Sequence, residues 1–334
     1  MKNFAIIGFG GLGKMHFLNL LKLQKERGDI RLTAICNSDL AAITKSMQLN
    51  ISAVSMDNID FSSYHLYTDY QEMVEKEALD FVFIALPSYL HCEVAVYCME
   101  HGIDVYTEKP MAVNPRQCER MIETSRATGQ KLMVGQSLRF SDEYIFLKKA
   151  IENNTYGRVV KAEFSRKSPL PGWSFQNWLL DEEKSGGCLV DMHVHDVDVM
   201  MWLFGKPEDV HVVTSHRMAE FESVYAIYKY PEHAVSIIGD WGLHTSFGFR
   251  AFYGVTFEKA YVECVNGVIT VYTNEGKEEI TLPGGDGLYR EEVEFIEGVV
   301  DGKPFVTADV ESVYETMKLV FTEKYGNHTE WRSI

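Results

Sequence analysis

The first part of the chain alternates between short apolar runs and longer amphipathic stretches. The apolar runs have the length of buried strands and lie at residues 4–7, 32–36, 81–85, 104–107 and 131–134. Between them, apolar residues recur at helical spacing at residues 17–23, 70–76, 91–101 and 115–128. Strands that alternate with helices are typical of a parallel, doubly wound sheet. We therefore predict an α/β fold whose first domain covers residues 1–136.

The pattern changes after about residue 139. Beyond residue 205, β-rich runs follow one another without helical patterns between them, at residues 210–216, 224–230, 235–241, 249–254, 259–264, 268–273 and 278–282. Two helical patterns, at 288–300 and 308–325, end the chain. We predict a second, α+β domain over residues 137–334 with a large, mainly antiparallel sheet. The alternating faces of this sheet leave one side open for an oligomer contact.

Composition limits the class of protein. Hydrophobic residues make up 46% of the chain, and 32 Lys plus Arg against 48 Asp plus Glu give a net charge of −16. Such a chain repels nucleic acid and anionic membranes, and no apolar stretch reaches the ~18 residues of a membrane span. The six cysteines form no Cys-x-x-Cys pair, which is typical of reduced core residues. Without a signal-peptide pattern, we expect a cytoplasmic protein with no nucleic-acid or membrane partner.

A glycine motif lies between the first strand and the first helix. Residues 8–13 read Gly8-Phe9-Gly10-Gly11-Leu12-Gly13, which is Gly-x-Gly-x-x-Gly in a strand-turn-helix setting. In this setting Gly8 makes the tight turn, Gly10 lets a pyrophosphate approach the backbone, and Gly13 lets helix and strand pack closely. The helix N-terminus, with Gly11 and Leu12, offers N–H groups to phosphates. The motif predicts dinucleotide binding.

The end of the second strand bears on the choice of cofactor. An acidic residue there normally holds the adenosine ribose hydroxyls of NAD, but this chain has Asn37 followed by Ser38. Asn37 lacks the charge that repels a 2′-phosphate, and Ser38 could donate to one. No arginine follows, so the sequence leaves NAD and NADP open and only slightly favours NADP. Asp39 is expected to cap the next helix.

Several polar or turn-forming residues come directly after predicted strands. In parallel sheets, ligands bind beyond the carboxyl ends of the strands. We therefore expect these residues to converge on one edge: Gly10, Asn37, Pro87, Glu108 and Gln136. Lys109 lies there too, and its ammonium could bind a ribose hydroxyl or a substrate oxygen. The alternative is a surface lysine in a turn fixed by Pro110.

The segment from Gly186 to Asp198 carries further candidate chemistry. It opens with two glycines, continues into a helical pattern and ends at Gly205. Asp191 and His195 are four residues apart, so on one helix they share a face, where the carboxylate could orient the imidazole for proton transfer. Alternatively, these polar residues cap a helix and face solvent. His193 and His195 are two apart and point in roughly opposite directions, so we expect no metal site.

Together these motifs resemble the Gfo/Idh/MocA oxidoreductase family in order and spacing. They are Gly8–Gly13, Leu86-Pro87-Ser88 with His91, Glu108-Lys109-Pro110, and Gly186-Gly187 with Asp191, His195 and Asp198. The resemblance implies an N-terminal Rossmann domain, a tightly held NAD(P), and a sugar, cyclitol or related polyol as substrate. It also implies a homodimer or homotetramer built on the open sheet. Leu86, Pro87, His91, Glu108 and Gln136 are then cofactor-binding candidates.

By the same resemblance, three residues carry the chemistry. Lys109 lies near the nicotinamide and the reacting oxygen, while Asp191 and His195 match the motif aspartate and histidine. Oxidation of a secondary alcohol removes a hydride and a proton, and His195, oriented by Asp191, could take the proton while Lys109 stabilises charge on the oxygen. Four further residues are candidates for the substrate pocket or, alternatively, for packing: Arg139, Arg166, Trp173 and Trp178.

Two other functions stay open at this point. The chain could be a glycoside hydrolase or epimerase that uses bound NAD(P) transiently. It could also be a sensor that binds the cofactor without turnover. Lys109, Asp191 and His195 together speak against a sensor, because cofactor binding alone does not need all three.

Overall fold

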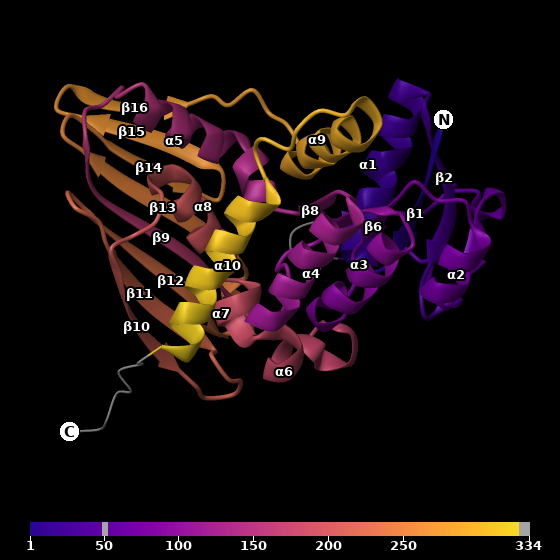
Figure 1. Ribbon diagram of the computed structural model, residues 1–334. Coiled ribbons are helices and arrows are strands. Elements are labelled where there is room, and N and C mark those ends of the chain that lie inside the picture. The colour runs from indigo at the N-terminus through magenta and orange to yellow at the C-terminus, as the bar shows by residue number, and fades with distance from the viewer. Residues whose placement is uncertain (49–52, 327–334) are drawn as a thin grey trace. The chain divides into compact units, whose positions relative to one another are not determined.

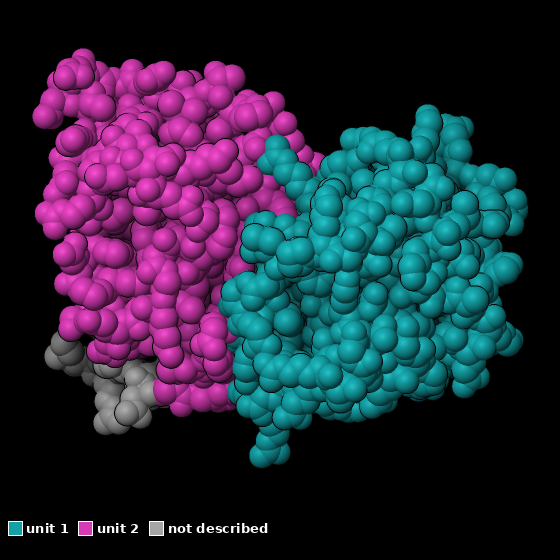
Figure 2. Space-filling model, turned by 45° about the horizontal axis from the view of Figure 1, so that its top comes forward, with its two compact units in different colours: residues 1–136, 288–314 teal, residues 137–287, 315–334 magenta. Residues whose placement is uncertain are grey.

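The computed structural model describes residues 1–48 and 53–326. The chain forms two compact units, coloured separately in Figure 2. The first unit combines Met1–Gln136 with Leu288–Tyr314, and the second combines Ser137–Gly287 with the chain from Glu315 onward. This differs from the predicted division, which placed everything after residue 136 in one domain. The aromatic ring of Phe295 packs against Phe81 and Phe83 of the first sheet, which explains why its helix belongs to the first unit.

The first unit is built on a six-stranded sheet in the order β5-β2-β1-β6-β7-β8. All five neighbouring pairs are parallel, as the doubly wound prediction requires. The strands are β1 (Lys2–Ile7), β2 (Ile30–Cys36), β5 (His65–Tyr67), β6 (Phe81–Ile84), β7 (Asp104–Thr107) and β8 (Leu132–Val134). The helices are α1 (Gly11–Arg27), α2 (Tyr70–Lys76), α3 (His91–Glu100), α4 (Pro115–Thr128) and α9 (Gly287–Asp301). A two-stranded ribbon, β3 (Met47–Gln48) with β4 (Ala53–Val54), lies outside this sheet.

The last residues of the central strands stand in one row across this sheet. Ile7 pairs with both Cys36 and Ile84, Ile84 pairs with Thr107, and Thr107 pairs with Val134. The segments that follow these strands therefore leave the sheet along one edge. This confirms the predicted convergence of the strand ends.

The second unit contains an eight-stranded sheet in the order β10-β11-β12-β9-β13-β14-β15-β16. Only the pair of β9 and β12 is parallel, so the sheet is mainly antiparallel, as predicted. Its strands are β9 (Val159–Pro169), β10 (Asp209–Ser215), β11 (Ser223–Lys229), β12 (Ala234–Leu243), β13 (Arg250–Phe257), β14 (Tyr261–Val265), β15 (Val268–Thr273) and β16 (Gly276–Ile280).

Helices cover one face of this sheet. They are α5 (Asp142–Glu152), α7 (Gly187–Asp191), α8 (Val194–Phe204) and α10 (Val310–Tyr325), while the short α6 (Glu182–Ser185) packs against α7. Figure 1 shows α5, α8 and α10 on the same side, and no helix of the described residues on the other. Within the described ranges, no helix has both the length and the apolar character needed to cross a bilayer.

Candidate active site

The glycine motif forms a tight turn between β1 and α1. Gly8 has φ +91, and a Cβ there would collide with the carbonyl oxygen of Ala85. A Cβ on Gly13 would collide with the carbonyl oxygen of Gly8, so close packing requires glycine at both positions. At Gly10, by contrast, a Cβ would meet no atom of the described residues within 4 Å. The turn therefore leaves open space at the glycine assigned to the pyrophosphate.

The N-terminus of α1 matches an anion as well. Its N-cap is Gly10, and among the described residues no side chain caps it and no acidic residue occupies its first turn. The N–H groups of a first helical turn have no partner within the helix, and the helix dipole is positive there. An open cradle beside such a terminus fits the phosphates of a dinucleotide.

Asn37 braces this turn from the end of β2. Its Oδ1 accepts the N–H of Phe9 at 3.0 Å, and its Nδ2 donates to the carbonyl of Asp39 at 2.7 Å. The Asp39 carboxylate accepts the N–H of Ala41, which confirms its predicted capping role for the short 3-10 helix Leu40–Ala42. Both polar atoms of Asn37 thus have protein partners, while Ser38 is exposed. The predicted contacts of Asn37 and Ser38 with a cofactor stay predictions.

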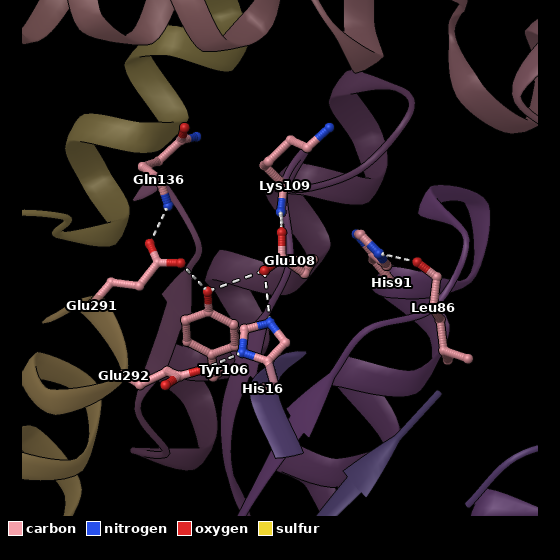
Figure 3. A network of polar contacts seen from close by, with 9 residues as sticks. All are labelled: His16, Leu86, His91, Tyr106, Glu108, Lys109, Gln136, Glu291 and Glu292. Atoms are coloured by element: carbon pink, nitrogen blue, oxygen red, sulfur yellow. Dashed lines mark hydrogen bonds and ion pairs between the residues drawn. The ribbon is translucent and has the colours of Figure 1, made fainter. Parts of the chain in front are cut away.

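Lys109 follows β7 at the edge where the strands end. It is the one residue from 105 to 113 that is not buried. Its backbone N–H donates to Oε2 of Glu108 at 3.2 Å, and its side chain points away from that carboxylate (Figure 3). A lysine that is partly exposed within a buried segment can present its ammonium to a ligand, as the prediction requires.

His91 connects two of the loops at this edge. Its two ring nitrogens lie 2.8 Å from the carbonyl oxygens of Pro110 and Leu86. Burial lowers the pKa of His91, so at neutral pH the ring carries one proton and donates to one carbonyl. His91 therefore braces the loop after β6 against the loop after β7. Its predicted contact with the cofactor stays a prediction, as do those of Leu86 and Pro87.

A buried group of charges that the sequence analysis missed lies behind Lys109. His16 of α1 contacts Oε1 of Glu108 at 2.8 Å and Oε1 of Glu292 at 2.6 Å (Figure 3). Burial alone would lower the pKa of His16, but hydrogen bonds to the two glutamates outweigh it and raise the pKa to about 10. His16 follows Gly13 by three residues, yet no pattern links it to Glu292, 276 positions away.

In the second unit, the predicted single helix from Gly186 to Gly205 is wrong. α7 ends at Asp191 and α8 begins at Val194, because the N–H groups of Met192 and His193 both donate to the carbonyl of Cys188. Asp191 and His195 thus lie on different helices. The buried ring of His193 anchors the break, since its Nε2 lies 2.9 Å from Oε2 of Glu323 and 3.1 Å from the hydroxyl of Tyr228.

Asp191 and His195 nevertheless stand out by their exposure. From residue 185 to residue 200, they alone are partly exposed, and every other residue is buried. A stretch that buries His193, Asp196 and Asp198 but leaves these two accessible presents a carboxylate and an imidazole to the surface of its unit. A cap that merely faces solvent does not explain the burial of the other charged residues.

The predicted pocket arginines bind aspartates of α8. Arg139 holds Asp198 through two hydrogen bonds, of 2.8 and 2.6 Å, and Thr316 donates to the same carboxylate at 3.0 Å. Arg166 pairs with Asp196 at 3.1 and 3.3 Å. Both arginines are buried, so their contacts in the structure hold α8 in place. Their contact with substrate stays a prediction.

The two predicted tryptophans lie on the loop between β9 and α6. Trp173 is 57% exposed. Trp178 packs against the buried cluster of Leu179, Cys188, Met192 and Trp241. Trp178 therefore supports α7 and the break that follows it, whereas Trp173 presents its ring to solvent.

Comparison with known proteins agrees with this architecture. The model of an oxidoreductase family with an NAD-binding Rossmann fold matches residues 2–136, and that of the GFO/IDH/MocA C-terminal domain matches residues 144–264. A D-glucoside 3-dehydrogenase from Escherichia coli is 27% identical over 343 residues, covering 95% of this chain and 92% of that protein. A 2,7-anhydro-N-acetylneuraminate hydratase from Mediterraneibacter gnavus is 28% identical over 213 residues, covering 62% of this chain and 50% of that protein.

A solved structure shares both units. The myo-inositol 2-dehydrogenase from Lactobacillus plantarum superposes with a TM-score of 0.77 at 25% identity, covering 97% of this chain and 96% of that one. The two family models together span most of the chain, one on each side of the boundary at residue 136. The chain therefore belongs to the Gfo/Idh/MocA family of oxidoreductases.

Proposed function

We propose that the chain is an NAD(P)-dependent oxidoreductase that acts on a secondary alcohol, or the matching ketone, of a sugar, cyclitol or related polyol. The proposal rests on which side chains are exposed. Within residues 105–113, Lys109 alone is accessible, and within residues 185–200, Asp191 and His195 alone are accessible. An ammonium, a carboxylate and an imidazole are the groups that alcohol oxidation needs. The dehydrogenases among the relatives support the substrate class.

The proposed mechanism assigns one task to each residue. Gly8–Gly13 and the first turn of α1 would hold the dinucleotide, which would supply the hydride acceptor when bound. Lys109 stabilises negative charge on the alcohol oxygen, because an ammonium favours the alkoxide-like state. His195 takes the hydroxyl proton, and Asp191 favours the charged imidazolium that results. In the reductive direction, His195 returns the proton.

Replacement of His195 tests this assignment. We expect His195→Ala to lower kcat by about 10²–10⁴-fold, the usual contribution of a general base, while NAD(P)H binding stays unchanged. Turnover is followed at the nicotinamide absorbance with myo-inositol, scyllo-inositol and methyl glucosides, and binding by titration. His101→Ala, at an exposed histidine of the first unit, is the matched control. Full activity of the His195 variant would show that another group moves the proton.

Cofactor preference is part of the proposal. Position 37 holds an asparagine instead of a carboxylate, so no charge there repels the 2′-phosphate of NADPH, and Ser38 just after β2 is exposed. We therefore expect NADPH to bind somewhat more tightly than NADH. Paired titrations measure this directly. Tighter binding of NADH would show that an acidic residue at this strand end is not needed for NAD.

A second candidate is a reaction without net oxidation. It is favoured by the hydratase relative, although this chain aligns with only half of that protein. A hydrolase or epimerase would use bound NAD(P) transiently. It would convert a glycoside or an epimer while the nicotinamide absorbance stays constant, so product analysis by chromatography separates it from the leading proposal.

We also propose that a second copy of the chain covers the open sheet face. One row of this face runs across seven strands, through Val213, Tyr225, Ile238, Ser165, Phe252, Val265 and Val268. All but Ser165 are apolar or aromatic, and Ile227 adds a side chain that is 57% exposed. Light scattering should find a dimer or tetramer that Ile227→Lys dissociates. A monomeric wild-type chain at micromolar concentration would contradict this assignment.

A further inference from the structure

The five residues behind Lys109 form what we call the carboxyl–histidine cluster: His16, Tyr106, Glu108, Glu291 and Glu292. They come from α1, β7, the segment after β7, and α9, all within the first unit (Figure 3). All five are buried. Glu108 was predicted to contact the cofactor, and that contact stays a prediction, since its carboxylate meets His16, Tyr106 and the backbone N–H of Lys109. The mechanism proposed above gives the cluster no task, so its burial calls for a separate explanation.

The hydrogen bonds of the cluster centre on His16. Each of its ring nitrogens faces a carboxyl oxygen, and the hydrogen bonds to the two glutamates raise its pKa to about 10, so the ring holds both protons at neutral pH. The Tyr106 hydroxyl lies 2.6 Å from Oε1 of Glu291 and 3.3 Å from Oε1 of Glu108. The shorter contact, to Glu291, is the main hydrogen bond of this hydroxyl.

Glu291 accepts the shorter of these two contacts. Its Oε1 accepts the hydroxyl proton of Tyr106 at 2.6 Å, and its Oε2 accepts the N–H of Gln136 at 2.9 Å. Burial and the charge of Glu108 raise the pKa of Glu291 well above the usual glutamate value.

The contacts within the cluster favour the ionised form of Glu108. Burial opposes its charge, but the hydrogen bond and charge of His16 lower the pKa of Glu108. Its Oε1 accepts hydrogen bonds from Nε2 of His16 and from the hydroxyl of Tyr106, and its Oε2 accepts the backbone N–H of Lys109. The ammonium of Lys109 leaves the segment in the opposite direction (Figure 3).

The cluster thus holds the backbone of two residues at the edge where the strands end. Glu108 binds the N–H of Lys109, and Glu291 binds the N–H of Gln136. His16, the cation between Glu108 and Glu292, comes from α1, the helix that follows the glycine turn. A buried hydrogen-bonded network of this kind restrains the groups it touches.

We propose that the carboxyl–histidine cluster positions Lys109 for the reaction, acting through the carboxylate of Glu108, and that Glu108 and His16 are positioning residues. This inference rests on the function proposed above. It differs from a purely structural role, which would affect folding but leave the rate of the folded enzyme unchanged.

Glu108→Gln is the main test, because it removes the charge but keeps the size of the side chain. We expect kcat to fall about 100-fold, as a small misplacement of a reacting group can cause. KM and the dissociation constant of NADPH should stay within a few-fold. Phe4→Leu is the control, since Phe4 is an apolar residue buried in the same unit, where it stacks on Phe81. It should lower the melting temperature and leave kcat unchanged.

A spectroscopic measurement tests the charge arrangement without turnover or cofactor. Nitrogen-15 NMR of His16 should show both ring nitrogens protonated at pH 8 in the wild-type chain. In Glu108→Gln the ring should lose a proton at lower pH than in the wild type. A neutral His16 at pH 8 in the wild type would overturn the proton assignment.

The outcomes separate this inference from the proposed function. If the wild type shows no turnover on any alcohol, the proposed function fails while the NMR result still reports on the cluster. If the wild type turns over and folded Glu108→Gln keeps wild-type kcat, the positioning role fails alone. Should Glu108→Gln not fold, Tyr106→Phe keeps the ring packing and removes one donor to Glu108, and we expect kcat to fall about tenfold. An unchanged kcat in Tyr106→Phe would then overturn the proposal.

Discussion

In each unit, buried charged residues support the accessible functional groups, but the kinds of residue differ between the two units. In the first unit, Lys109 is backed by a histidine between two glutamates, with a third buried glutamate, Glu291, nearby. In the second unit, α8 is fixed by the buried pairs of Arg139 with Asp198 and of Arg166 with Asp196. Histidine and glutamate change charge with pH, whereas arginine stays charged throughout the accessible range. At alkaline pH the arginines that support α8 therefore stay charged, while the histidine behind Lys109 loses its charge.

The largest effect is expected where an arginine pair is broken. Asp198→Asn leaves the buried Arg139 without a counter-charge, and loss of one partner of a buried pair typically costs about 3–5 kcal/mol of unfolding free energy. Urea unfolding followed by tryptophan fluorescence reports on the second unit, because the four tryptophans among the described residues all lie in that unit. Glu208→Gln, which breaks an exposed contact with Lys229 in the same unit, should have a much smaller effect. Equal losses in the two variants would contradict the role assigned to the buried pair.

An intermediate effect concerns pH. The pKa of His16 is raised to about 10, so the stability it contributes is complete below the ordinary histidine pKa and is lost as pH rises through about 10. One such group changes the free energy of unfolding by at most about 1.4 kcal/mol per pH unit. Thermal melts of the first unit, followed by circular dichroism from pH 7 to pH 10, should show this decline.

The same melts compare the two units. His16→Gln should flatten the decline of the first unit, and the transition followed by tryptophan fluorescence should move less over this range. The same pH slope in both transitions of the wild type would show that His16 does not distinguish the two units.

The smallest effect is expected for Glu291→Gln. Burial and the charge of Glu108 raise the pKa of Glu291 well above the usual value, so its carboxyl ionises at higher pH than an ordinary glutamate, and an uncharged amide is expected to be a close substitute. The amide oxygen can accept the N–H of Gln136 and the amide nitrogen can donate to Tyr106. We expect unfolding free energy to change by no more than about 1 kcal/mol, against a larger loss in Glu108→Gln. A loss in Glu291→Gln as large as that in Glu108→Gln would show that Glu291 is ionised.

Much of the fold could be predicted from local patterns, because the periodicity of strands and helices and the glycine turn depend on residues that are close together in the sequence. The parallel order of the first sheet and the shared edge of its strand ends follow from the alternation of strands and helices. β5 was not predicted, since three residues that include an exposed Leu66 carry no readable periodicity.

The long-range pairings could not be predicted in this way. Periodicity shows which side of an element is buried but not which residue it meets there. Arg139 and Asp198 are 59 positions apart, and His16 and Glu292 are 276 apart. The interruption between Asp191 and Val194 depends on the distant Glu323 and Tyr228, which draw His193 inward. The same limit explains why α9 was assigned to the C-terminal domain.

The discontinuity of the first unit has a consequence for synthesis. When the ribosome has released residues 1–136, His16 and Tyr106 still lack Glu291 and Glu292, and Phe81 and Phe83 lack the ring of Phe295. These partners emerge only after the whole eight-stranded sheet has been translated. Until then, part of the core of the nascent N-terminal segment stays exposed. Exposed apolar surface of this kind favours chaperone binding or aggregation.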